Sequence, residues 1–209
     1  MTNNTVFIIL AGGQSKRMGI AKGLLDYYDT YWLLEQLNRI SKTQIKEVYI
    51  GLGFHYQDYF KAIPWLAEAE TDFVPFNTMK VKVVINPHPE HGSFSTLQAV
   101  LQTIEKKYDV LLCPIDIPIP NTKDLNAILE IKNEVVLPNY DGKNGHPIKL
   151  SASFWKSLTQ LDPKEANARL DFQIKKINSA QITHVKVNDS AILKNLNTQK
   201  DWGDYLNQK

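Results

Sequence analysis

Adjacent glycines and nearby basic residues follow the first apolar run of this sequence, a combination suited to binding phosphate groups. The apolar run at 6–10 leads directly into a loop that contains Gly12, Gly13, Arg17 and Lys22. The glycines let the backbone turn sharply and direct successive N–H groups at an anion, and the basic side chains add formal charge. We therefore expect a phosphate-bearing ligand at the carboxyl end of this strand.

The spacing within this loop differs from the two best-known phosphate-binding motifs. Neither the dinucleotide fingerprint G-x-G-x-x-G nor the P-loop G-x-x-x-x-G-K-[ST] is present, because Met18 stands five residues after Gly13 and no GK[ST] follows. Hydride transfer and P-loop ATPase activity therefore lack their main support. Taken alone, the glycines are also compatible with a tight turn that carries exposed charges.

A lone carboxylate, Asp116, ends the apolar run at 111–115. Packing does not explain an isolated acid at the end of an apolar strand, whereas a divalent cation would use its oxygen atoms. The alternative is that Asp116 caps the next helix, but Pro118 and Pro120 push that helix several residues away. We expect Asp116 to be a ligand.

Short apolar runs rich in β-branched residues alternate with helical periodicity along the chain. The predicted strands are 6–10, 48–52, 81–85, 110–112, 135–137 and 182–187, and the predicted helices cover 32–40, 97–104 and 125–131, the last capped by Thr122. Alternation of this kind predicts an α/β fold of three layers, with a mostly parallel, twisted sheet between helices. Residues 54–79 interrupt this alternation as an irregular surface segment, in which Pro64 and Pro75 flank an acidic stretch.

Length and composition indicate one ordinary domain over residues 1–209. The net charge of +2 gives no reason to expect a nucleic-acid partner, and no run reaches membrane-spanning length. The single cysteine, Cys113, lies in an apolar run, where an inert buried thiol is expected, and the cytoplasm is the expected location. His88 and His91 have no Cys partners, so we expect a surface loop there and no zinc site.

The loop carries the string L-A-G-G-x-S-x-R-M-G-x-x-K at 10–22. This string resembles the signature loop of the molybdenum cofactor nucleotidyltransferases, the cytidylyl and guanylyl transferases that act on molybdopterin. The resemblance implies a Rossmann-like nucleotidyltransferase fold and a loop that wraps a nucleoside triphosphate. It assigns phosphate contacts to Gly12, Gly13, Ser15, Arg17 and Lys22.

Further segments resemble the family in the same order. The segment Asn86-Pro87 followed by 92–97 places Ser95 and Thr96 beside the base and ribose, together with Leu10 and Ala11 of the first loop, although Ser95 and Thr96 are also plausible N-caps. The segment around Asp116 resembles the strand end that holds Mg²⁺.

Two later segments complete the resemblance. The loop that ends in Gly145 and His146 is similar to the loop that borders the acceptor in cytidylyl members. Asn197 stands where guanylyl members have asparagine in the motif N-x-N-T-P-E, but this chain lacks the proline. An amide oxygen of Asn197 would serve as a second Mg²⁺ ligand, and the alternative is that Asn197 and Thr198 cap the terminal helix.

The resemblance implies that an NMP is transferred from an NTP to a phosphorylated acceptor such as molybdopterin, with Arg17, Lys22 and Asp116 as the catalytic residues. CTP is favoured over GTP because of the segments at 92–97 and 145–147, whereas Gly12 and its missing side chain favour a purine. The alternatives are a sugar- or polyol-phosphate nucleotidyltransferase, and a non-catalytic nucleotide-binding module on the same fold.

Overall fold

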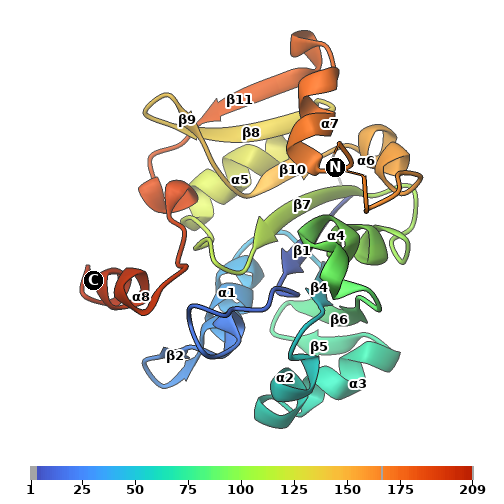
Figure 1. The fold of residues 1–209 in the computed structure, drawn as a ribbon. Helices are drawn as coiled ribbons and strands as arrows, with labels where there is room; N and C mark the ends of the chain where they lie inside the picture. Colours follow the sequence, from blue (N-terminus) through green and yellow to red (C-terminus); the bar gives the residue numbers. More distant parts are fainter. Residues whose placement is uncertain (1–3, 166, 209) are drawn as a thin grey trace.

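The computed structural model describes residues 4–165 and 167–208, and a nine-stranded sheet runs through it (Figure 1). The strand order is β11-β8-β10-β7-β1-β4-β6-β5, and β9 pairs with β8. Pairing is parallel along β7, β1, β4 and β6 and between β11 and β8, whereas β10, β5 and β9 run antiparallel to their neighbours. The predicted α/β fold with a mostly parallel sheet is confirmed.

All six predicted strands are present: β1 Thr5–Leu10, β4 Glu47–Leu52, β6 Met79–Ile85, β7 Asp109–Pro114, β8 Val135–Tyr140 and β11 Ile182–Lys186. Sequence patterns missed the short strands β5 Val74–Phe76, β9 Lys143–Asn144 and β10 Ile148–Leu150, and a separate ribbon of β2 Asp26–Tyr27 with β3 Thr30–Tyr31. Two or three residues are too few to show an alternating pattern, so these strands are defined only by their pairing with a neighbouring strand.

Two helical layers cover the faces of the sheet. One face packs against α1 Trp32–Ser41, α2 Tyr56–Ala62, α3 Trp65–Thr71, α5 Thr122–Glu130 and α8 Gln199–Leu206. The other packs against α4 Ser93–Leu101, α6 Ala152–Leu158 and α7 Leu170–Lys176. In β1 the side chains of Phe7 and Ile9 enter the first layer and those of Val6 and Ile8 the second, because successive strand residues face opposite sides.

The three predicted helices correspond to α1, α4 and α5, with corrections at their ends. The α5 helix begins at Thr122, and its N-cap is Asn121, whose side-chain oxygen accepts a hydrogen bond from the N–H of Asp124. The segment 54–79 is more regular than we expected. It forms α2, α3 and β5, and the prolines Pro64 and Pro75 lie at the start of α3 and within the edge strand β5, where a missing N–H is tolerated.

Within the described residues, no helix is long and apolar enough to cross a membrane. Cys113 is buried in β7, and burial raises the pKa of its thiol well above the ordinary value. The thiol is therefore protonated at neutral pH, which agrees with the inert role expected from the sequence.

Candidate nucleotide-binding site

The first glycine of the loop is required by packing. A β-carbon on Gly12 would lie 2.8 Å from Thr96 Oγ1 on α4 and 3.2 Å from the backbone nitrogen of Gly53. The carbonyl of Gly12 also accepts a hydrogen bond from the N–H of Phe54. The space beside Gly12 is therefore filled by protein, which removes our sequence-based argument that its missing side chain leaves room for a purine.

The space beside the second glycine, Gly13, is open, because no atom lies within 4 Å of a β-carbon built there. Gly13 is exposed and lines a cavity. Beyond it, Ser15 adopts a left-handed conformation with φ of 50°, and its hydroxyl accepts a hydrogen bond from the N–H of Lys22 at 3.3 Å. The side chain of Gln199 on α8 donates to the carbonyl of Met18 at 2.7 Å. The loop is thus closed on itself and held by the C-terminal helix.

Three distant segments meet at the ammonium group of Lys22. Lys22 Nζ lies 2.8 Å from Asp116 Oδ2 and 2.6 Å from Asn197 Oδ1. The backbone also joins these segments, because the N–H of Leu196 donates to the carbonyl of Asp116 at 2.8 Å. The structure therefore brings together Lys22 and Asp116, two of the predicted catalytic residues, and Asn197, the second predicted metal ligand.

These oxygen atoms fit a divalent cation. A carboxylate and an amide oxygen are the donors that Mg²⁺ prefers, and in this structure both already converge on a single positive charge, the Lys22 ammonium. The two oxygens are therefore placed so that they could share a single cation. Asp201, which would be the next acid to consider, accepts hydrogen bonds from the N–H groups of Asn197 and Thr198.

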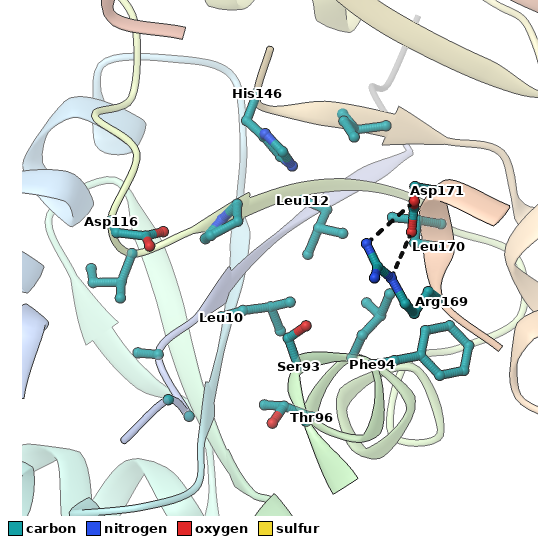
Figure 2. Close-up of a pocket in the computed structure, with 18 of the residues that line it drawn as sticks. Leu10, Ser93, Phe94, Thr96, Leu112, Asp116, His146, Arg169, Leu170 and Asp171 are labelled. Carbon is teal, nitrogen blue, oxygen red and sulfur yellow. Dashed lines mark hydrogen bonds and ion pairs between the residues drawn. The ribbon is translucent and has the colours of Figure 1, made fainter. Parts of the chain in front are cut away.

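A cavity of about 980 Å³ extends from the glycine loop across the carboxyl end of β7 (Figure 2). In the close-up, Asp116 lies on one side, Leu10 lies near the centre with Ser93 and Thr96 of α4 below it, and Leu170 and Asp171 of α7 lie opposite Asp116 with the N-cap Arg169. The lining includes the predicted residues Leu10, Ala11, Gly12, Gly13, Ser15, Lys22, Thr96, Asp116 and His146. A nucleotide and a second molecule of similar size both have room in such a volume.

The half of the cavity beneath α7 is mainly apolar. Its lining side chains are Phe94, Leu112, Leu137, Ile148, Leu170 and Ile174. Arg169 and Asp171 form an ion pair at 3.0 Å above them, and Arg169 is exposed. Our sequence analysis assigned no site residue to 170–176, yet Lys175 of α7 also lines the cavity. The position of α7 beside the cavity depends on how the chain folds back over the sheet, which the local sequence does not indicate.

His146 lies in the cavity wall, and its ring points into the open space (Figure 2). Burial lowers its pKa from 6.5 to about 4, and the charge of Asp116 opposes that effect. The ring is therefore neutral at neutral pH. Gly145 packs against the chain instead of facing the cavity: its N–H donates to Pro138 O, and a β-carbon on it would lie 2.2 Å from Ile192 O.

Four predicted residues lie outside the cavity lining: Gly145 and Asn197, whose contacts are given above, and Arg17 and Ser95. Arg17 is exposed on the loop. Ser95 is buried, and its hydroxyl donates to the carbonyls of His88 and Gly92. Their assigned contacts stay predictions.

The structure shows which residues cap the N-termini of helices α4 and α8. The α4 helix begins at Ser93 after Gly92, so neither Ser95 nor Thr96 is its N-cap. At α8, by contrast, the hydroxyl of Thr198 accepts from the N–H of Asp201 in a capping box, as one sequence alternative predicted. This cap leaves the side chain of Asn197 free to contact Lys22.

Several solved structures share this fold. Rv0371c of Mycobacterium tuberculosis, in a complex with manganese, superposes with a TM-score of 0.72 at 18% identity over 99% of this chain and 100% of its own. A nucleotidyl transferase of Methanothermobacter thermautotrophicus gives 0.75 at 15% identity over 99% and 97%. Molybdopterin-guanine dinucleotide biosynthesis protein A of Archaeoglobus fulgidus gives 0.66 at 14% identity over 97% of each chain.

The fold of this chain is therefore one that nucleotidyltransferases of known structure share. Residues 7–177 match the family model of the MobA-like NTP transferase domain, and the chain belongs to that family. No curated protein sequence matches this chain significantly.

Proposed function

We propose that this protein transfers an NMP from an NTP to a phosphorylated, molybdopterin-like acceptor and releases pyrophosphate. The observation that carries the proposal is the meeting of Lys22, Asp116 and Asn197 beside the glycine loop. The Lys22 ammonium provides a positive charge, and Asp116 and Asn197 provide two oxygen ligands for a metal ion, at one edge of a large cavity. Transfers to phosphorus depend mainly on such positioning and charge neutralisation.

In the proposed reaction a terminal phosphate oxygen of the acceptor forms a bond to the α-phosphorus of the NTP. The bond from that phosphorus to the bridging oxygen breaks, and pyrophosphate leaves with the electron pair. No general base is needed, because an acceptor phosphate is ionised at neutral pH. The N–H groups of Gly12 and Gly13 and the Lys22 ammonium bind the triphosphate, and Arg17 approaches from the exposed part of the loop.

Asp116 and Asn197 would hold Mg²⁺, which when bound neutralises charge on the phosphate oxygens. Lys22 contacts the side-chain oxygens of both residues in this structure, so its ammonium would turn from them to reach a phosphate.

The acceptor is proposed to lie between His146 and α7. The apolar side chains of Leu112, Ile148 and Ile174 offer no hydrogen bonds to a polyhydroxylated chain, and unpaired hydroxyl groups are costly to bury. This lining favours an acceptor with a planar ring over the alternative, a sugar or polyol phosphate. CTP is the proposed donor and GTP the alternative.

A panel of the four common NTPs, each with and without molybdopterin and Mg²⁺, tests the proposal by pyrophosphate release. We expect release only when all three components are present. Release with ribitol 5-phosphate but not with molybdopterin would support the polyol-phosphate alternative. Nucleotide binding without release from any acceptor would leave a non-catalytic binding module.

A further inference from the structure

Three side chains that can ligate a transition metal gather in the turn between β6 and α4. His88 precedes the short 3₁₀ helix η2 Pro89–His91, which also contains Glu90. His88 Nδ1 lies 3.2 Å from Glu90 Oε1, and His91 Nε2 lies 3.6 Å from the same oxygen. One donor atom from each residue lies within 4.8 Å of the other two, and no other such group occurs among the residues described.

These separations match those of ligands around one ion. Bonds of about 2.0–2.2 Å at tetrahedral or octahedral angles place neighbouring donor atoms about 3–3.5 Å apart. The two distances to Glu90 are already in or near this range. Only the two imidazoles, which stack with centroids 5.3 Å apart, must approach each other by a change in side-chain torsion.

The backbone of the turn is fixed in advance. Asn86 is buried, and its side-chain oxygen accepts the N–H of His88 at 2.9 Å. The hydroxyl of Ser95 donates to the carbonyl of His88 at 3.0 Å, and the amide of Asn86 donates to Ser95 Oγ at 2.8 Å. Because both helix α4 and strand β6 hold the turn, binding an ion needs little further ordering of the chain.

We propose that His88, Glu90 and His91 bind one divalent transition-metal ion of the zinc, nickel or cobalt type, with water in the remaining positions. Two imidazoles and one carboxylate suit these ions and not Mg²⁺, which prefers oxygen ligands. The site is therefore chemically distinct from Asp116 and Asn197. It lies at the rim of the cavity, because Glu90 also lines it. The proposal departs from our expectation from sequence, which rested on the lack of Cys partners for the two histidines.

Cobalt binding to the purified chain, followed by calorimetry and by visible absorption at pH 7.5, tests the proposal. We expect one cobalt ion per chain and at least tenfold weaker binding for His88→Gln and for His91→Gln. His55→Gln is the matched control, because His55 is an exposed histidine that pairs only with Asp58 in this structure. It should bind cobalt as the unaltered chain does.

Asp116→Asn should leave this cobalt binding unchanged, so the result does not depend on the proposed transferase activity. Melting temperatures within about 2 °C of the unaltered chain would show that the exposed substitutions keep the fold. The proposal is overturned if the double variant His88→Gln with His91→Gln binds cobalt as tightly as the unaltered chain, or if the unaltered chain binds none at 1 mM (roughly the weakest affinity of metal sites in proteins).

Discussion

Lys22 Nζ lies 2.8 Å from Asp116 Oδ2, although 94 residues separate them in the chain. The same ammonium contacts Asn197 Oδ1 at 2.6 Å. A protein cation thus occupies the position between two oxygens that would suit a metal ion. In the proposed function, nucleotide binding exchanges these partners: Lys22 turns to the phosphates as Asp116 and Asn197 turn to Mg²⁺.

Lys22→Ala should lower kcat/KM by roughly 30- to 1000-fold, since loss of a charge that stabilises the transition state costs about 2–4 kcal/mol. The fold should persist, because the Lys22 ammonium contacts Asp116 and Asn197 at the edge of the cavity and not the core. Steady-state kinetics with the preferred NTP measure the effect. Lys16→Ala is the matched control in the same loop, since Lys16 is exposed and does not line the cavity. A loss of less than threefold for Lys22→Ala would contradict its role.

Asp116→Asn should abolish Mg²⁺-dependent turnover yet leave weak nucleotide binding through the loop N–H groups. The amide keeps the shape of the carboxylate and loses the charge that a hard cation requires. Calorimetric titration with Mn²⁺ in the presence of NTP measures metal binding directly. Asp204→Asn serves as control, because Asp204 pairs on the surface with Lys200. Unaltered Mn²⁺ binding by Asp116→Asn would move the metal site elsewhere.

Gly145→Ala should destabilise the protein by about 1–3 kcal/mol, because the added carbon meets the backbone of Ile192 and forces one segment to move. Urea unfolding measures the loss. Gly203→Ala is the control: Gly203 lies in α8 with no atom near its missing side chain, so alanine there should be neutral or stabilising by up to about 1 kcal/mol. Equal midpoints for the two variants would show that the 145–192 contact is not tight.

His146 should make the protein less stable at acid pH. Its pKa is about 4 in the folded chain against 6.5 ordinarily, so the unfolded chain binds a proton between these values that the folded chain does not. Stability is therefore lost as pH falls from about 6.5 to 4, by at most about 3 kcal/mol. Urea unfolding at pH 7 and pH 4.5 should show a smaller difference for His146→Gln. An unchanged difference would mean that His146 titrates normally.

CTP should outcompete GTP for one limiting acceptor. A base whose polar edge is matched by buried groups is favoured by about 1–3 kcal/mol per group left unpaired by the wrong base. Because Thr96 and Gly53 fill the space beside Gly12, a larger base gains no room there. Products separated by chromatography give the ratio directly. A tenfold advantage of GTP would reverse the donor preference and leave the transferase proposal intact.

Sequence reasoning predicted the parts of the fold whose signal is local. The six longer strands and helices α1, α4 and α5 follow from apolar periodicity, which reflects burial on one or both sides. The glycine loop and Asp116 were identified because residue type and position at a strand end already limit their chemistry. The match of residues 7–177 to the family agrees with the resemblance of that loop.

Other features depended on contacts between residues far apart in the chain. The reversed strand β10, the reach of α7 over the cavity and the packing of Gly145 on Ile192 leave no periodic signal in the sequence. The convergence of Lys22, Asp116 and Asn197 likewise required the path of the chain. Sequence spacing places a residue on an element, whereas the distance between two side chains depends on how the elements pack, and that is decided by the tertiary structure.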